Sequence, residues 1–542
     1  MSGSNARWFL LLAVTLGLAV LAGVWYTGSR PSATRPPQLL AVYEEGVAGT
    51  YARVNPIFDS SNEVDRDLTA LVFSGLTRLA ANGEVQPDLA ESWDISSDGL
   101  TYTFHLRQNV VWHDSEPFTA DDVLFTIGAL QDNDFRGPPA SAELFRAITA
   151  RKVDDLTVQI VLVQPFSPLL AHLSIGILPA HLLSDLDAGG LFTDAFNQEP
   201  VGTGPFRLTQ LTPESAVLES NPRYYFGEPY IQRFELRFYN DEAALLKALK
   251  DDEIQGAFFR SPLNADDSNF LDGDVSLRVL QLPSTTYTIL YFNDVMPPLQ
   301  DKLVRQALAY DVDRTQIIDT VLNGQAVRAD SPIPVGTWAY YPSLDRYTLD
   351  ATEAERLLDE AGWRRQQNGQ RAKDGQELRL NLVTNEDSTR IAVAEAIARE
   401  WTALGVQTVV STERPTNLLR DTLMPHRFFV AIYGFDTGLD PDLYPAYHSS
   451  QTIAGSNNLS GFSDPQADIL LQDARQTSDN DARKSLYRQF QELYAREMPS
   501  LPLYHRTLTY IVDRRLQGIE PMPLFDSGSR FTNIREWVLE TQ

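Results

Sequence analysis

The chain of 542 residues contains no cysteine, and only six of its 45 basic residues are lysine. The absence of cysteine excludes disulfide bonds, thiolate metal sites and cysteine nucleophiles. It does not identify the compartment, because many exported proteins fold without disulfides.

The sequence also lacks the motifs of several enzyme classes. It has no G-x-x-x-x-G-K-[ST] loop, no G-x-S-x-G elbow and no H-E-x-x-H site. The stretch VGTGPFR (201–207) has Arg207 where a dinucleotide loop would need a third glycine. The seven histidines show no close metal-ligand spacing. These absences favour a binding protein without catalysis, cofactor or metal, although a triad assembled from distant residues would not show in the sequence.

Basic residues are outnumbered by acidic ones, 45 to 72, which gives a net charge of -27. The acids are spread along the chain, so its surface repels phosphates and a nucleic-acid partner is excluded. Hydrophobic residues make up 43% of the chain, as in a globular protein. Because a single core stops growing near roughly 250–300 residues, at least two lobes are expected.

One long apolar run is present, at the N-terminus. Residues 8–26 carry no charge and would cover about 28 Å as a helix, close to the ~30 Å bilayer core. The stretch LAGVWY (21–26) has Val24 where a bacterial lipoprotein carries its lipidated cysteine. We expect residues 1–26 to form a transmembrane anchor, followed by a linker (27–38). A cleavable signal peptide is the alternative, and both place the remaining residues outside the cytoplasm.

The stretch TRLAANGEVQPDLAESWDISSDGLTYTFHLRQNVVWHD (77–114) reads as hairpins. Asn82-Gly83 and Asp98-Gly99 predict two-residue turns, because both residues of each pair favour positive φ. Apolar residues then alternate with polar ones, which predicts a strand with one buried face, formed by Tyr102, Phe104 and Leu106.

Helix and strand signals continue along the first half. Residues 117–130 read as a helix, with Thr119 as its cap and Asp122 completing a capping box. Residues 154–165 alternate as a strand.

The second half changes character, because helices and strands alternate along it. Helices are predicted at 299–324 (a pair), 350–363, 388–405 and 465–497 (a pair), and strands at 377–383, 406–411, 428–434 and 501–512. This alternation favours an α/β lobe with a largely parallel sheet.

Four segments resemble one known family. The stretch GEVQPDLAESWDISSDGLTYTFHLRQNVVWHDSEPFTADDVLFTI (83–127) is similar to the hallmark segment of the family 5 extracellular solute-binding proteins, the dipeptide/oligopeptide receptors of ABC importers. The stretches PVGTGPFRL (200–208), DKLVRQALAYDVDRTQII (301–318) and AERLLDEAGW (354–363) match further family segments in the same order. The resemblance covers about residues 39–515.

The resemblance implies an α/β, two-lobed periplasmic-binding-protein-like fold with a large discontinuous first lobe and an α/β second lobe, preceded by the transmembrane helix. Lobe I would span 39–286, with a sub-domain at about 61–195, and lobe II 287–500, before a C-terminal return to lobe I (501–542). Such a protein, expected to be a monomer, captures short peptides by hinge closure and delivers them to the permease subunits of an ABC importer.

The family's aspartate that binds the peptide ammonium group corresponds to the stretch IYGFDTGLDPDLYP (432–445). Asp440-Pro441 matches the family's acid-proline pair. Thr437 stands at the expected spacing, and Asp436 lies one residue earlier. Asp436 is therefore either a ligand residue or a turn residue, since aspartate favours turns.

Further ligand contacts are expected at several places. Asn62 and Glu63 lie near the position where family members line the cleft, and Tyr287 lies at the presumed lobe crossing. Tyr433 and Phe435 flank the aspartate loop, and Trp338 lies in the Pro/Gly-rich stretch PVGTWAYYP, where an aromatic side chain can close over a ligand. Core packing explains Tyr287 equally well, and a helix cap is the alternative role of Asn62 and Glu63.

Three other functions stay open. The same fold binds other solutes, such as an oligosaccharide, a metal chelate or an opine-like compound. The position of Asp436, one residue before the family spacing, is compatible with such a solute. A ligand sensor without transport is compatible with the membrane helix. A secreted hydrolase would cleave bound peptide, and no motif supports it.

Overall fold

The structure is a computed structural model, and the residues that it describes are 42–59, 62–344, 347–453 and 455–540. The predicted anchor or signal segment (1–26) and the linker (27–38) lie outside the described residues. Among the described residues, no helix is both long enough and apolar enough to cross a membrane. The chain from Val42 onward forms one compact unit.

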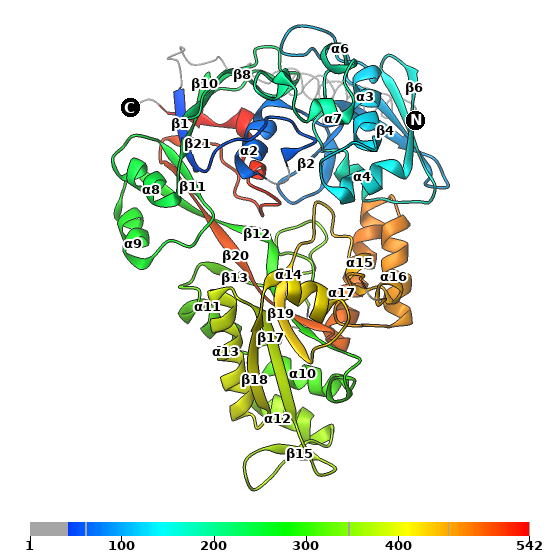
Figure 1. Cartoon of the computed structure of the whole chain (residues 1–542), viewed down its shortest axis with the longest axis vertical. Helices are drawn as coiled ribbons and strands as arrows, with labels where there is room; N and C mark the ends of the chain where they lie inside the picture. Colours follow the sequence, from blue (N-terminus) through cyan, green and yellow to red (C-terminus); the bar gives the residue numbers. More distant parts are fainter. Residues whose placement is uncertain (1–41, 60–61, 345–346, 454, 541–542) are drawn as a thin grey trace, which may run out of the picture. The chain divides into compact units, whose positions relative to one another are not determined.

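Strands and helices are interspersed along this unit (Figure 1). The strands are β1 (Val42–Ala48), β2 (Thr77–Leu79), β3 (Val85–Pro87), β4 (Ala90–Ile95), β5 (Thr101–Leu106), β6 (Ile148–Asp154), β7 (Thr157–Leu162), β8 (Phe206–Leu211), β9 (Ser215–Ser220), β10 (Arg233–Tyr239), β11 (Gly256–Phe259), β12 (Leu277–Phe292), β13 (Ala326–Arg328), β14 (Arg364–Arg365), β15 (Arg371–Lys373), β16 (Gln376–Glu377), β17 (Arg379–Asn385), β18 (Gln407–Glu413), β19 (Val430–Phe435), β20 (Ser500–Asp513), β21 (Leu516–Gln517) and β22 (Val538–Leu539). The helices are α2 (Glu63–Val72), α3 (Ala120–Gln131), α4 (Pro139–Arg146), α5 (Leu169–His172), α6 (Ala180–Leu183), α7 (Ala188–Leu191), α8 (Glu242–Lys250), α9 (Ala265–Gly273), α10 (Lys302–Tyr310), α11 (Arg314–Thr320), α12 (Ala351–Glu360), α13 (Ser388–Ala403), α14 (Pro415–Asn417), α15 (Tyr444–Tyr447), α16 (Pro465–Gln476) and α17 (Asn480–Glu497).

A sheet of eleven strands connects most of these elements. Its order is β18-β17-β19-β12-β20-β11-β1-β10-β9-β8, and β13 pairs with β20. β12 and β20, which are 16 and 14 residues long, run antiparallel side by side (Figure 1). β12 also pairs with β19, and β20 with β11, so these two long strands join the two ends of the sheet.

The apolar side chains form separate cores. The largest draws its buried residues from 43–282 and 510–537. Three others draw theirs from residues 287–504. We call the parts built around these two sets of cores the first region and the second region. The predicted lobe limits, 286/287 and 500/501, fall inside β12 and at the start of β20 and remain predictions.

Local signals in the first region confirm several predicted elements. Helix α3 begins after Thr119, and the predicted capping box forms, with the Asp122 carboxylate accepting a hydrogen bond from the Thr119 backbone N–H at 2.9 Å. In β5, the alternating residues Tyr102, Phe104 and Leu106 are buried, as the period of two predicts.

The predicted two-residue hairpin turns are wrong. Gly83 and Gly99 have positive φ, 77° and 69°, but Asn82 and Asp98 do not. Instead, the side-chain oxygens of Asn82 and Asp98 each accept a hydrogen bond from the backbone N–H two residues ahead, at 3.1 Å. This local bond holds each in an Asx turn, and the loops are accordingly longer.

The predicted helices and strands of the second half are present, but its sheet is mixed. β17 runs parallel to β18 and to β19, as the alternating pattern predicts. β12 pairs antiparallel with β19, and β20 pairs antiparallel with β12, so the two long strands add an antiparallel part to this sheet.

Candidate functional site

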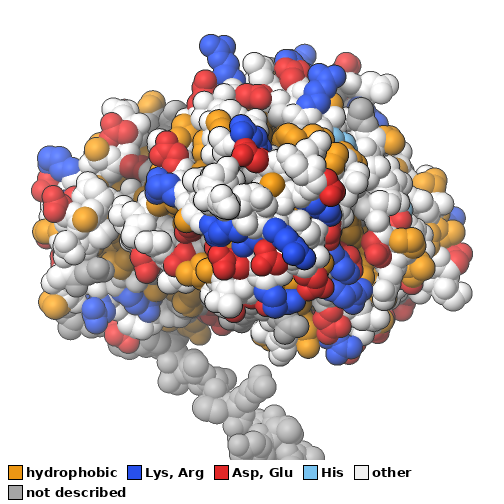
Figure 2. All heavy atoms as spheres, turned by 90° about the horizontal axis from the view of Figure 1, so that it is seen from below, with side chains coloured by type: hydrophobic (Ala, Val, Ile, Leu, Met, Phe, Trp, Pro, Cys, Tyr) orange, Lys and Arg blue, Asp and Glu red, His pale blue; other side chains and the backbone are white. Residues whose placement is uncertain are grey.

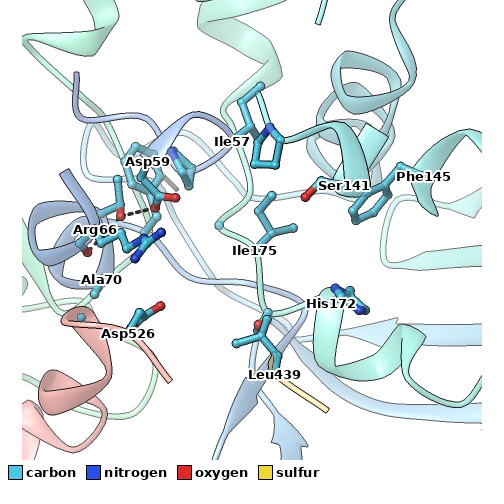
Figure 3. A pocket seen from close by; sticks show the side chains of 17 residues that line it. Ile57, Asp59, Arg66, Ala70, Ser141, Phe145, His172, Ile175, Leu439 and Asp526 are labelled. Atoms are coloured by element: carbon cyan, nitrogen blue, oxygen red, sulfur yellow. Dashed lines mark hydrogen bonds between the residues drawn. The ribbon is translucent and has the colours of Figure 1, made fainter. Parts of the chain in front are cut away.

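A cavity of about 270 Å³ lies beside helix α2 (Figure 3). Its lining consists of Pro56, Ile57, Asp59, Arg66, Thr69, Ala70, Phe73, Pro138, Ser141, Phe145, His172, Ser174, Ile175, Gly176, Leu439, Asp526 and Gly528. Leu439 belongs to the loop after β19, in the second region, and the other residues belong to the first. Larger hollows near His113 and Pro139 are lined by the first region alone, so we take the shared cavity as the candidate site.

Two carboxylates and a guanidinium lie together on one side of this cavity. Figure 3 shows Asp59, Arg66 and Asp526 on this side. Asp59 accepts a hydrogen bond from the Thr69 hydroxyl at 2.6 Å, and Asp526 accepts two from Ser529, at 2.7 and 2.8 Å. Because a carboxylate can accept about four hydrogen bonds, both retain capacity for a further donor.

Burial changes the acidity of both carboxylates. It raises the pKa of the Asp59 carboxyl to about 7, with a contribution from the nearby Asp526, and the bond from Thr69 opposes it. Burial likewise raises the pKa of Asp526, against the hydrogen bonds from Ser529. A cation entering the cavity would favour the charged form of both groups.

Buried ion pairs support the helix that carries Arg66 and Thr69. Arg530 lies between Glu45 of β1 and Asp67 of α2, at N–O distances of 2.6 to 2.9 Å. The hydroxyl of Tyr510 donates to the second oxygen of Glu45 at 2.6 Å. All three charged side chains are at most 2% exposed, so α2 is fixed against β1 and the C-terminal segment.

The start of α2 holds two of the predicted ligand residues. The Asn62 side-chain oxygen accepts from two backbone N–H groups of the first turn, at 2.9 and 3.2 Å, so Asn62 caps the helix. Glu63 pairs with Arg66 at 2.9 Å, and its carbonyl accepts a hydrogen bond from Ser527. Neither is among the residues that line the cavity.

The opposite side of the cavity combines His172 with the loop after β19. Figure 3 shows His172, Ser141 and Phe145 on this side and Leu439 reaching in from the second region. Burial lowers the pKa of His172, and the nearby Asp440 opposes this shift.

Asp440 itself has a structural partner. Both of its oxygens accept hydrogen bonds from the buried Arg483 guanidinium, at 2.8 and 3.0 Å. Asp440-Pro441, the pair that matches the family motif, therefore anchors the loop to α17.

The predicted ligand residues Tyr433, Phe435 and Asp436 lie together at the end of β19. Asp436 is exposed, and its carboxylate accepts a hydrogen bond from the Gly438 backbone N–H at 2.9 Å. Phe435 is half-buried, and its ring centroid lies 5.3 Å from that of Tyr287. The turn role of Asp436 is visible, and its ligand role remains a prediction.

Tyr287 and Trp338 are held by their neighbours. Tyr287 is 2% exposed, and its hydroxyl donates to the Pro332 carbonyl at 2.9 Å, as expected for a core residue. Trp338 is half-buried, and the Arg483 guanidinium lies 5.2 Å from its ring centroid. The Trp338 backbone N–H also donates to the Asn82 carbonyl of the first region at 2.8 Å.

The carboxyl ends of the parallel strands β17 and β19 carry further polar groups. Asn385 ends β17, and its side-chain oxygen is buried without a hydrogen-bond partner among the described residues. Arg390 of α13 places its guanidinium 5.6 Å from the Tyr433 ring centroid and forms no ion pair with any described residue. Ligands of open α/β sheets bind at such strand ends.

Sequence reasoning missed Asp59, Arg66, His172 and Asp526 of the cavity lining, and also Arg390, which lies outside that lining beside Tyr433. For Arg390 a signal existed, because a polar segment that joins a strand to a helix is a typical binding position. The described residues hold no group of three or more acidic or histidine side chains placed to bind a metal ion.

Comparisons with known proteins agree with this architecture. Residues 84–457 match the model of the bacterial extracellular solute-binding proteins, family 5. The dipeptide-binding protein of Escherichia coli is 32% identical over 465 residues, 81% of this chain and 84% of that protein. The oligopeptide-binding protein AppA of Bacillus subtilis is 27% identical and covers 98% of both chains.

A solved structure shows that the fold is also similar. NikZ from Campylobacter jejuni, in complex with Ni(L-His), is 30% identical, and the alignment covers 92% of this chain and all of that one with a TM-score of 0.67. The mixed α/β architecture with two lobes is thus that of the solute-binding proteins. The chain belongs to the bacterial extracellular solute-binding proteins of family 5.

Proposed function

We propose that this chain is the extracytoplasmic receptor of an ABC importer and that its cargo is short peptides. Two relatives that it resembles over most of its length are named for binding dipeptides and oligopeptides. In this proposal the first and second regions are lobes I and II, with the limits 39–286, 287–500 and 501–542.

The observation that carries the proposal is the charged cavity between the lobes. A short peptide brings one ammonium group and one carboxylate, and each needs an opposite charge once it is buried. Asp59 and Asp526 offer partners for the ammonium group. For the carboxylate we propose Arg390, which lies outside the cavity lining, beside Tyr433 of β19, and has no ion pair among the described residues.

The end of β19 supplies the second lobe's part of the proposed site. Asp436 is the further candidate for the ammonium group, because it lies in the same loop as Leu439, which lines the cavity. We propose Tyr433, Phe435 and Trp338 as aromatic contacts. The cavity of about 270 Å³ lies just below the range typical of ligand pockets, roughly 300–1,000 Å³, and therefore fits a small cargo.

Binding and delivery require no reaction in this chain. Cargo that contacts both lobes stabilises the closed arrangement, because only that arrangement makes both sets of contacts. The permease would recognise the closed receptor, and ATP would be hydrolysed by other subunits. We propose that the chain acts as a monomer without catalytic activity and that residues 1–26 tether it to the membrane.

A non-peptide cargo is the second candidate. The NikZ structure contains Ni(L-His), so a chain with this fold and 30% identity binds a metal chelate. The position of Asp436, one residue before the family spacing, fits a cargo without a free amine.

Native mass spectrometry of the full-length chain, purified in mild detergent without refolding, tests the proposal. We expect a ladder of small added masses that fragment as peptides, because closure slows the release of cargo. A single non-peptide mass would keep the receptor function and overturn the peptide cargo. Cleavage of added peptides would contradict the absence of catalysis.

A further inference from the structure

The lobes also meet through residues that do not line the cavity, at the C-terminal end of α16. This helix ends at Gln476, so the carbonyls of its last turn lack partners within the helix. Ser167, in the loop before α5, donates its backbone N–H to the Arg475 carbonyl at 2.8 Å and its hydroxyl to the Thr477 carbonyl. A residue of lobe I therefore satisfies two carbonyls of lobe II.

The side chain of Arg475 joins the same lobes a second time. Its guanidinium binds the Asp442 carboxylate with two hydrogen bonds, of 2.6 and 2.9 Å. The guanidinium carbon lies 4.2 Å from the ring centroid of Tyr444, in lobe II, and 5.3 Å from that of Phe166, in lobe I. Because Asp442 and Tyr444 fix the guanidinium, the Phe166 ring contacts a cation already in place.

This contact adjoins one end of the cargo cavity. Ser167 lies five residues before His172, which is the last residue of the short helix α5 and lines the cavity. On the other side, Asp442 lies three residues after Leu439, which also lines it. The contact thus lies next to the His172 end of the cavity, since the Asp442 that binds Arg475 is also near enough to His172 to affect its pKa.

We propose that the Phe166–Ser167 loop and the end of α16 form a latch that holds the lobes together and sets the length of the cargo. The latch function rests on the contacts alone, whereas the effect on cargo length also rests on the proposed function. With the latch closed, a peptide cannot extend past the His172 end of the cavity. The receptor is therefore selective for dipeptides and tripeptides over longer peptides.

The distance between two spin labels tests the latch without any cargo. Because the chain has no cysteine, Val163→Cys and Ile469→Cys label the two lobes specifically, at residues that are 83% and 61% exposed. We expect the double variant Phe166→Ala/Ser167→Ala to lower the ratio of short to long label distances about tenfold, the effect of losing the hydroxyl bond to Thr477 and the ring contact with Arg475, since the backbone N–H bond of residue 167 remains. Ser167→Ala alone keeps the ring and should shift the ratio less, in the same direction.

A matched control is Phe270→Ala, which removes an exposed phenylalanine of α9 in lobe I. This control should leave the distances unchanged. Equal distance distributions in the wild-type chain, the control and the double variant would overturn the latch, whatever the cargo is. Thermal unfolding of each labelled variant shows whether the chain remains folded.

Pools of random dipeptides, tripeptides and hexapeptides test the selectivity for length. We expect the wild-type chain to bind the shorter pools at least tenfold more tightly than the hexapeptides, and the double variant to lose most of this preference. The same preference in both chains would overturn the role of the latch in setting length. Failure of every pool to bind would contradict the proposed function, while the label distances would still decide whether the latch exists.

Discussion

The two sides of the cavity are built in different ways. The side formed by α2 rests on Arg530, Glu45 and Asp67, which are buried and bonded to one another. The side formed by the loop after β19 begins with an exposed turn at Asp436 and is anchored only further on, by the pair of Asp440 and Arg483. The difference suggests a preorganised wall in lobe I and a wall in lobe II that adjusts on closure.

Figure 2 adds a comparison with the outer surface. On the face shown, acidic and basic side chains are intermingled rather than gathered into fields of one sign. The paired carboxylates of Asp59 and Asp526 in the cavity contrast with this surface, where many charges form exposed ion pairs of small energetic effect.

The largest expected effect comes from breaking the support of α2. Arg530→Met would leave Glu45 and Asp67 buried without their partner, so we expect the free energy of unfolding to fall by about 3–5 kcal/mol. Urea denaturation measures this change. The control Arg379→Met breaks an exposed pair with Glu377 and should cost less than ~1 kcal/mol. Equal effects of the two variants would contradict the preorganised wall.

The next effect concerns cargo affinity. Asp59→Asn removes a charge that we assign to the cargo ammonium group, so we expect affinity for the copurifying peptide to fall roughly 10- to 100-fold, the loss of one charge-assisted hydrogen bond. Titration calorimetry of the full-length chain measures the affinity. Asp436→Asn is the matched change in lobe II and should cost less, because Asp436 is exposed. If Asp436→Asn lowered the cargo affinity more than Asp59→Asn does, the binding site for the ammonium group would lie in the loop after β19 instead.

A third prediction concerns pH. With its pKa raised to about 7, Asp59 holds a proton in the folded chain that the unfolded chain releases near pH 4. The wild-type free energy of unfolding, relative to Asp59→Asn, should therefore fall as pH rises from about 4 to about 7. Urea denaturation across this range measures the difference. The control Asp98→Asn removes an exposed carboxyl whose pKa is lowered by a hydrogen bond from Ser96. The free energy of unfolding of the wild-type chain relative to this control should therefore stay nearly constant between about pH 4 and about pH 7. If the free energy of unfolding of the wild-type chain relative to Asp59→Asn did not change with pH, the pKa of Asp59 would not be raised in the folded chain.

The smallest effect separates the two roles considered for Asn62. Asn62→Ala should lower the free energy of unfolding by about 1 kcal/mol through loss of the helix cap and should leave cargo affinity within about twofold. Asn62→Asp keeps a capping oxygen and should restore most of the stability. A tenfold loss of affinity in Asn62→Ala at unchanged stability would instead make Asn62 a ligand residue.

The sequence predicted most elements of the fold, because their signals are local. Thr119 and Asp122 cap α3 as expected, and the alternation of Tyr102, Phe104 and Leu106 identified the buried face of β5. The turn types were missed because the side chains of Asn82 and Asp98 bond to nearby backbone N–H groups, and this competing interaction is not visible in residue type alone.

The site was harder to predict because it is assembled from distant segments. Asp59 and Asp526 are separated by more than 400 residues, and only the return of the chain through β20 brings them together. The aromatic at Tyr287 matched a pattern that suits core and ligand contacts equally, and only its bond to Pro332 shows the packing role.

Hydrogen–deuterium exchange of the full-length chain, with and without its copurifying cargo, tests the central claim most directly. If cargo binds between the lobes, exchange should slow at residues 55–59, 172–176 and 436–442 together, and the edge strand β8 should be unaffected. Slower exchange confined to a hollow of the first region, such as residues 198–211, with no change at 436–442, would contradict a cargo site shared by the two lobes.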